Sequence, residues 1–130
     1  MGAFRVFRDF LNMPHLVIEY FAEDGIDRRA VLQAAVACAA ASGVMQRGDI
    51  KARLLPAEAV LLGDGGQSFI HVTIALLAGR SPEVKLALAE AMTRDLRATC
   101  PEIHAISVDI RDMDPGCYKK SLGKAGALRR

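Results

Sequence analysis

The sequence contains no tryptophan, only three cysteines and almost no excess of charge of either sign. A net charge of +2 over 130 residues is too small to argue for nucleic-acid binding on charge alone. Apolar residues make up 52% of the chain, and most are alanine, leucine, valine and isoleucine, which is typical of an ordered globular protein. The length fits one domain, and a domain of this size gains stability from oligomerisation.

The three cysteines, Cys38, Cys100 and Cys117, are odd in number, widely spaced and form no CxxC motif. This pattern argues against a disulfide framework or a zinc knuckle and indicates a reducing compartment, so we expect a cytoplasmic protein. No apolar run approaches the roughly 18 residues of a membrane-spanning helix. The first residues lack the continuous apolar segment and the small-residue cleavage site of a secretory signal. We therefore expect no membrane as a partner, and the small net charge gives no reason to expect a nucleic acid.

The first half of the chain predicts a strand, a helix and a second strand. Residues 15–20 alternate apolar and polar side chains, several of them β-branched, which favours a strand. Asp27 can cap a helix that ends before Gly43, a residue suited to the position after a helix. Residues 50–62 predict a second extended segment, and Pro56 indicates a bulge or a sheet edge.

The second half repeats this order after a glycine-rich turn. Residues 63–66 (GDGG) predict a hairpin turn, and residues 68–77 have the strongest strand propensity in the chain, which favours a central strand. Ser81 and Pro82 mark the start of a second helix as N-cap and first helical residue. Residues 103–110 alternate as a last strand.

The predicted fold class is α/β (α+β), built from two β-α-β units at residues 15–62 and 68–111. Crossover helices imply parallel pairing within each unit. Two such units form a four-stranded sheet with both helices on one face. The other face is then bare and partly apolar, so we expect it to need a partner.

Three segments and this two-unit layout carry a family resemblance. The segments are MPHLVIEY at 13–20, IKAR at 50–53 and HVTIALLAGRS at 71–81. Together they resemble the tautomerase superfamily and, within it, the 5-carboxymethyl-2-hydroxymuconate isomerase family, over about Met13 to Arg111. The resemblance implies a tautomerase domain over residues 13–130 and a homotrimer with inward-facing sheets. It also implies enol–keto isomerisation of an unsaturated 2-hydroxy di- or tricarboxylate in aromatic catabolism, with no metal and no organic cofactor.

Pro14 is the residue on which this resemblance depends, because members of the superfamily use an amino-terminal proline as a general base. A secondary amine is a base only when unprotonated, and burial and neighbouring cations both lower its pKa toward neutrality. The nitrogen of an internal proline is an amide and has no such function. Residues 1–12 form an extension before Met13, so Pro14 can act only if translation starts at Met13 or the extension is removed. We expect the mature protein to begin at Pro14.

Three cations are the candidate substrate-binding residues. Arg80 follows the central strand and precedes a helix N-terminus, where anions are favoured, and the resemblance implies that it binds a substrate carboxylate. Lys51 and Arg53 alternate on one side of the second strand, where the family pattern carries two arginines. Lys51 keeps the charge but not the planar fork of an arginine, which leaves the substrate preference open. By position alone, each of the three is equally compatible with a solvated side chain at a strand end or edge.

The remaining ionisable residues on predicted strands favour structural roles. His15, His71 and His104 form no metal-binding motif and are predicted to be hydrogen-bonded core or interface residues. Glu19 and Asp109 alternate outward on their strands and are predicted at the surface or in an interface.

Two other functions are compatible with the same fold. The protein could be a non-enzymatic trimeric interaction module, in which the extension blocks Pro14 and docks on a partner. The docking face would be the apolar helical face formed by Phe4, Phe7, Phe10 and Leu11. It could also use a different acid–base group for a related hydrolysis or dehalogenation. The mass of the protein made from its natural transcript distinguishes the enzyme from the module.

Overall fold

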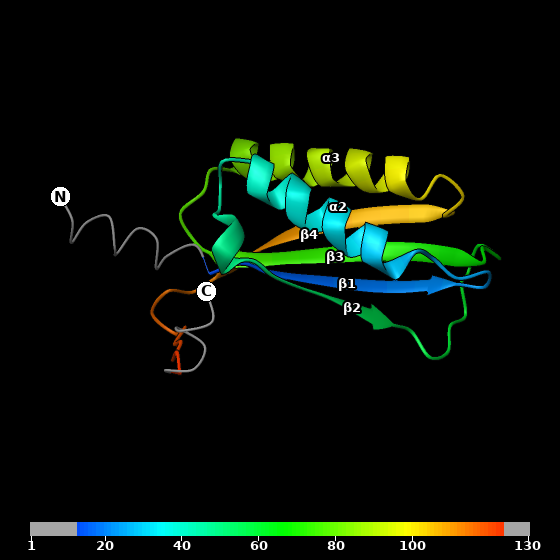
Figure 1. The fold of residues 1–130 in the computed structure, drawn as a ribbon, viewed down its shortest axis with the longest axis horizontal. Coiled ribbons are helices and arrows are strands. Elements are labelled where there is room, and N and C mark those ends of the chain that lie inside the picture. Colours follow the sequence, from blue (N-terminus) through cyan, green and yellow to red (C-terminus); the bar gives the residue numbers. More distant parts are fainter. Residues whose placement is uncertain (1–12, 124–130) are drawn as a thin grey trace.

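The computed structural model describes residues 13–123 and shows a four-stranded mixed sheet with two helices on one face (Figure 1). The elements are β1 (His15–Ala22), α2 (Arg28–Ala41), the 3₁₀ turn η1 (Arg47–Asp49), β2 (Lys51–Pro56), β3 (Ser68–Leu77), α3 (Pro82–Thr99) and β4 (Ala105–Met113). The predicted fold class and the placement of both helices are confirmed. The extension at residues 1–12 lies outside the described residues, as does the end of the predicted 13–130 domain.

The sheet consists of two parallel strand pairs that lie side by side. β1 pairs with β2 and β3 pairs with β4 in parallel, as the β-α-β pattern predicted. An antiparallel pairing of β1 with β3 joins the two units and gives the order β2-β1-β3-β4. The strand with the highest propensity, β3, is therefore central, and β2 with Pro56 is an edge strand, as predicted.

The hydrophobic core lies between the sheet and the two helices. Alternate side chains of β1 and β3, among them Leu16, Ile18 and Ile74, are completely buried beneath the helices. Ala35 of α2 is also completely buried, and its small side chain allows the helix backbone to lie close to the sheet. Met92 of α3 is also completely buried and belongs to the same core cluster. Burying each large side chain of this kind contributes roughly 1.5–3 kcal/mol to folding.

The predicted extended segment 50–62 and the predicted hairpin at 63–66 are both wrong in part. β2 ends at Pro56, and the last bond to its neighbour is donated by the backbone N–H of Ala57 to the carbonyl of Tyr20 at 2.8 Å. β3 pairs with the opposite edge of β1, so the chain from residue 57 to 67 must pass around the end of β1. The glycine-rich segment is therefore part of a long connection between β2 and β3, two strands that do not pair with each other.

The last strand begins two residues later than predicted and continues to Met113. The reason lies in a turn that follows α3, where the guanidinium of Arg97 donates to the carbonyl oxygen of Pro101 at 3.1 Å and to that of Ile103. These bonds hold the backbone in a turn until Ala105, where pairing with Phe69 begins.

The second face of the sheet carries side chains of mixed polarity. No helix within residues 13–123 lies on this face (Figure 1). The side chains that point toward it alternate with the buried positions of the strands; they include Val17 and Glu19 of β1, His71 and Thr73 of β3, and Asp109 of β4.

None of the helices in the described part of the chain has the length and apolar content of a membrane span.

Candidate active site

One end of the sheet gathers the predicted site residues, because β1 and β2 begin there and β3 and β4 end there. His15 at the start of β1 is the register partner of Lys51 at the start of β2. On its other side, His15 lies opposite Ala75 near the end of β3. The segments that follow β3 and β4 therefore return to the neighbourhood of Pro14.

Pro14 directly precedes β1, and its side chain is fully buried. Its carbonyl oxygen accepts a hydrogen bond from the backbone N–H of Lys51 at 3.2 Å, which extends the pairing of β1 and β2 by one residue. Met13, on the other side of the peptide bond, is also buried. In the chain as written, the nitrogen of Pro14 is an amide and carries no basic lone pair.

Lys51 and Arg53 lie on the same side of β2, two residues apart, and both are exposed. They share the bare face of the sheet with His15. Nη1 of Arg53 lies 3.2 Å from Nδ1 of His15. The structure therefore places these two predicted residues beside the residue that follows Pro14, and it gives Arg53 an imidazole as its partner.

The environment of His15 disfavours a positive charge. Burial is the main cause that lowers the pKa of His15 below its ordinary value, and the positive charges of Arg53, Lys51 and Lys120 lower it further. Such surroundings favour the neutral form of a basic group and attract an anion. This environment is adjacent to Pro14 in the chain.

Arg80 lies at the same end of the sheet, between β3 and α3. The hydroxyl of Ser81 caps α3 by accepting a hydrogen bond from the backbone N–H of Val84 at 3.2 Å, as the sequence predicted. Arg80 is half-buried, and its Nη2 donates to the carbonyl oxygen of Val44 at 3.2 Å. Val44 belongs to the loop after α2, so Arg80 links two loops beside the start of β1.

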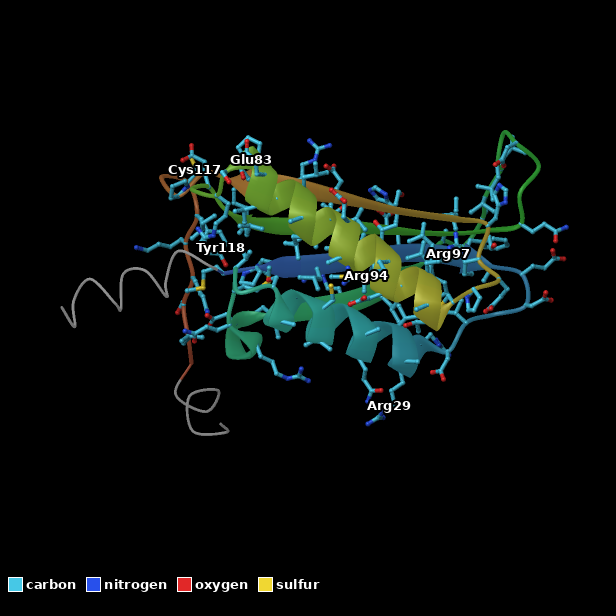
Figure 2. All side chains as sticks on the ribbon, turned by 90° about the horizontal axis from the view of Figure 1, so that it is seen from above. Arg29, Glu83, Arg94, Arg97, Cys117 and Tyr118 are labelled. Carbon is cyan, nitrogen blue, oxygen red and sulfur yellow. The ribbon has the colours of Figure 1, made fainter. Side chains whose placement is uncertain are left out.

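Two residues of the segment after β4 contact this end of the sheet and were missed by the sequence analysis. Tyr118 Oη lies 3.5 Å from Nε2 of His15, and the two rings meet edge to face with their centroids 6.5 Å apart. Lys120 Nζ lies 3.0 Å from the sulfur of Met13. Figure 2 shows Tyr118 beyond the strand ends, close to the start of β1. No periodicity or motif in this segment indicates these contacts.

The other two histidines have structural partners. Nδ1 of His71 lies 2.6 Å from the hydroxyl of Ser107 on the bare face of the sheet. Nε2 of His104 lies 2.9 Å from the carboxylate of Asp64, at the opposite end of the sheet from Pro14. The prediction that His104 lies on a strand is wrong, since it is exposed and precedes β4. All three histidines have a hydrogen-bonding partner, as predicted, but His104 is exposed and is therefore not a core residue.

The two predicted surface acids lie on the bare face of the sheet. Glu19 is exposed, and its register partner on β3 is His71. Asp109 is half-buried and accepts a hydrogen bond from Nε of Arg111 at 2.6 Å. Neither acid lies at the end of the sheet where Pro14 is found.

The cysteines offer no activated nucleophile. Burial raises the pKa of Cys38 to about 11 and also raises that of Cys100, so both thiols are protonated at neutral pH. Cys117 is exposed, and its sulfur lies 3.5 Å from a carboxylate oxygen of Asp114. Among the residues that the structure describes, no three His, Cys, Asp or Glu side chains form a group that could hold a metal ion.

The sheet order, the paired β-α-β units and the position of Pro14 define a protein of the tautomerase fold. Residues 14–122 match the 5-carboxymethyl-2-hydroxymuconate isomerase family, and the chain belongs to that family. The match begins at Pro14. Comparison with curated protein sequences gave no match.

Solved structures of similar proteins agree with this assignment. A 5-carboxymethyl-2-hydroxymuconate isomerase from Deinococcus radiodurans R1 is 25% identical, with a TM-score of 0.72, over 92% of this chain and 96% of that one. A 5-carboxymethyl-2-hydroxymuconate delta-isomerase is 22% identical, with a TM-score of 0.73, over 93% and 95%. A fused 4-OT wild-type symmetric trimer is 20% identical, with a TM-score of 0.70, over 88% and 98%. The family match and the Deinococcus radiodurans structure support an isomerase function, and the other two structures support the fold.

Proposed function

We propose that the protein is a cytoplasmic tautomerase that converts the enol form of an unsaturated 2-hydroxy di- or tricarboxylate to its keto form, as in aromatic catabolism. The observation that carries the proposal is the family match, which begins at Pro14. In this proposal the working protein begins at Pro14, whose amine is then free. The positive surroundings of His15 support a lowered pKa for that amine, because Pro14 directly precedes His15 and the same cations lie close to both residues.

The proposed reaction is a proton transfer that needs no co-reactant. The nitrogen of Pro14 takes the proton from the 2-hydroxyl group of the substrate, and the electron pair moves through the conjugated double bonds. The same nitrogen then returns the proton to a distant carbon, so atoms and charge balance. Lys51, Arg53 and Arg80 hold the carboxylates and stabilise the negative charge that develops on the dienolate.

Two versions of the protein, with their first residues defined by intact mass, test this proposal. One begins at Pro14 and the other retains residues 1–13. Loss of the ultraviolet absorbance of a 2-hydroxymuconate-type dienol measures turnover. We expect activity only in the protein that begins at Pro14, and we expect Pro14→Ala in that protein to reduce kcat by about 100-fold or more. Equal activity in both versions would show that Pro14 is not the base.

A homotrimer is part of the same proposal. The bare face of the sheet includes half-buried apolar and polar side chains, such as Val17 and Thr73, that a second and a third copy would cover. The 4-OT structure described above is a trimer of the same fold. Light scattering of the purified protein should give the mass of three chains, and a mass of one chain would contradict the trimer.

One observation favours the non-enzymatic interaction module as a second candidate. Met13 is only 6% exposed and is contacted by Lys120, so the fold accommodates a residue bonded to the nitrogen of Pro14. The intact mass of protein from its natural transcript separates the two candidates. A chain that begins at Met1 or Gly2 supports the module, and one that begins at Pro14 supports the enzyme.

A further inference from the structure

Three side chains from three separate elements form a hydrogen-bonded row beside Pro14. Arg53 comes from β2, His15 from β1 and Tyr118 from the segment after β4. Nη1 of Arg53 lies 3.2 Å from Nδ1 of His15, and Nε2 of His15 lies 3.5 Å from Oη of Tyr118. The edge-to-face contact of the two rings, with an angle of 65° between their planes, restricts the orientation of the tyrosine.

The chemistry of arginine fixes the direction of this row. A guanidinium has donors only, so Nδ1 of His15 must accept the hydrogen bond from Arg53 and carries no proton. A neutral imidazole then has its proton on Nε2, which donates to the oxygen of Tyr118. With its oxygen accepting this bond, the tyrosine has its own hydroxyl proton available for another acceptor.

The charges that face His15 favour the neutral form that this direction requires. Arg53 and Lys51 face it from β2, and Lys120 faces it from the segment after β4. Burial and these charges lower the pKa of His15, so the imidazole is neutral near pH 7. Successive donors in one direction also polarise the last hydroxyl group and make it a better donor.

The segment after β4 contacts both residues that flank Pro14 in the sequence. Tyr118 contacts His15, which follows Pro14, and Lys120 contacts Met13, which precedes it. Tyr118 is half-buried and lies beyond the strand ends, close to the start of β1 (Figure 2). Its hydroxyl is therefore a hydrogen-bond donor held next to the residue that follows Pro14.

We propose that Tyr118 is a catalytic residue of the proposed tautomerase, and that His15 is its positioning residue. The hydroxyl of Tyr118 donates a hydrogen bond to the substrate oxygen that becomes negative when Pro14 removes the enol proton. Tyr118 keeps its own proton throughout, so the proton balance of the reaction is unchanged. This inference rests on the proposed function and adds a residue that neither the sequence motifs nor the set of cations includes.

Substitution of the two tyrosines of the chain provides a matched test. In the protein that begins at Pro14, we expect Tyr118→Phe to lower kcat by about 100-fold with little change in KM, since the hydrogen bond strengthens only as charge develops. Tyr20→Phe is the control, because Tyr20 is buried near the other end of β1. An unchanged kcat in Tyr118→Phe, in protein that still depends on Pro14, would overturn the inference and leave the proposed function standing.

A double substitution tests whether His15 acts through Tyr118. We expect His15→Ala to lower kcat less than Tyr118→Phe does, and the double variant to be no slower than Tyr118→Phe alone. Additive losses would show that His15 acts independently and would overturn its positioning role.

Nitrogen-15 NMR of the imidazole gives a readout that needs no substrate. We expect the Nε2–H tautomer of His15 at pH 7 and a changed Nε2 signal in Tyr118→Phe. A protonated His15, or the Nδ1–H tautomer, would overturn the inference even if no substrate were turned over. Absence of activity in the protein that begins at Pro14 would instead count against the proposed function.

Discussion

Positive charge dominates the residues around Pro14, and Lys120 is the cation that contacts the residue bonded to its nitrogen. In the protein that begins at Pro14, we expect Lys120→Gln to raise the pKa of the Pro14 amine, because a nearby cation disfavours its charged form. A base with a raised pKa becomes active at higher pH. In a plot of kcat/KM against pH, the acid limb should therefore move to higher pH by roughly half a pH unit to one pH unit.

Lys119 offers the matched control for this experiment. It is the neighbouring residue in the chain and is exposed, whereas Lys120 is half-buried. Lys119→Gln removes the same charge from the same segment and should leave the acid limb in place. If the limb does not move in Lys120→Gln, Lys120 has no influence on the general base.

Arg80 is the residue for which a binding role and a structural role have to be separated. We expect Arg80→Ala to lower kcat/KM for a dicarboxylate substrate by about 10- to 100-fold, since a hydrogen bond to a charged group contributes roughly 1.5–3 kcal/mol. Arg80 also donates to the carbonyl of Val44, so the unfolding temperature must be measured in parallel. Arg47→Ala, at an exposed arginine of η1, is the control. An unchanged kcat/KM in a folded Arg80→Ala protein would rule out carboxylate binding by Arg80.

At the scale of the elements, a group of hydrogen bonds among Asp64, Gly66, Ser68 and His104, here called the clasp, holds the glycine-rich end of the long connection between β2 and β3. One carboxylate oxygen of Asp64 accepts from the backbone N–H of Gly66 at 2.8 Å, and the other lies 2.9 Å from Nε2 of His104. The backbone N–H of His104 donates to the hydroxyl of Ser68 at 2.8 Å. A Cβ on Gly66 would come within 2.8 Å of the His104 ring, so a larger residue at this position would require the ring to move.

The clasp predicts a pH-dependent contribution to stability. The hydrogen bond from Gly66, and then that from His104, lower the pKa of Asp64. The stabilisation is therefore fully present above the carboxyl pKa of the unfolded chain, about 4, and is lost as the pH falls through the lower folded value. We expect Asp64→Asn to lower the unfolding temperature at pH 7, with the difference shrinking in acid. Asp24→Asn, in the exposed turn after β1, should show no such difference; a difference that persists unchanged in acid would contradict the ionised clasp.

How far the sequence predicted these elements depends on whether the signal is local. The cap of α3 at Ser81 and the alternation of β1 are local and were predicted correctly. The antiparallel pairing of β1 with β3 was not predicted, because strand order is not encoded in the pattern of either strand. That pairing turns the predicted hairpin into a connection around the end of β1.

In the candidate site, too, the residues with a local sequence signal were predicted and the residue without one was not. Pro14, Lys51, Arg53 and Arg80 lie in segments with a strand pattern or a family motif, and the fold brings these segments to one end of the sheet. Tyr118 lies in a segment without periodicity, 103 residues from the histidine that it contacts. Only the path of the chain after β4 reveals this contact.

At the scale of the whole molecule, the bare face of the sheet bears on both assembly and catalysis. Val17 lies near its centre, with Arg53 as register partner on β2 and Thr73 on β3. In the proposed trimer this position is covered, and a lysine there would bury a charge next to Arg53 at a cost of several kcal/mol. In a single chain the half-exposed position would let the ammonium group reach water. We therefore expect Val17→Lys to remain folded and to shift the mass by light scattering from three chains to one.

Leu86→Lys provides the control, because Leu86 is 61% exposed on α3, on the helical side of the molecule. It adds the same charge and should leave the mass at three chains. Activity measured on both variants decides whether one chain forms a complete site. If Val17→Lys is a folded single chain that keeps full turnover, then Pro14, the cations and Tyr118 of one protomer suffice. If turnover falls with the mass, then residues of a second copy take part in holding the substrate against Pro14.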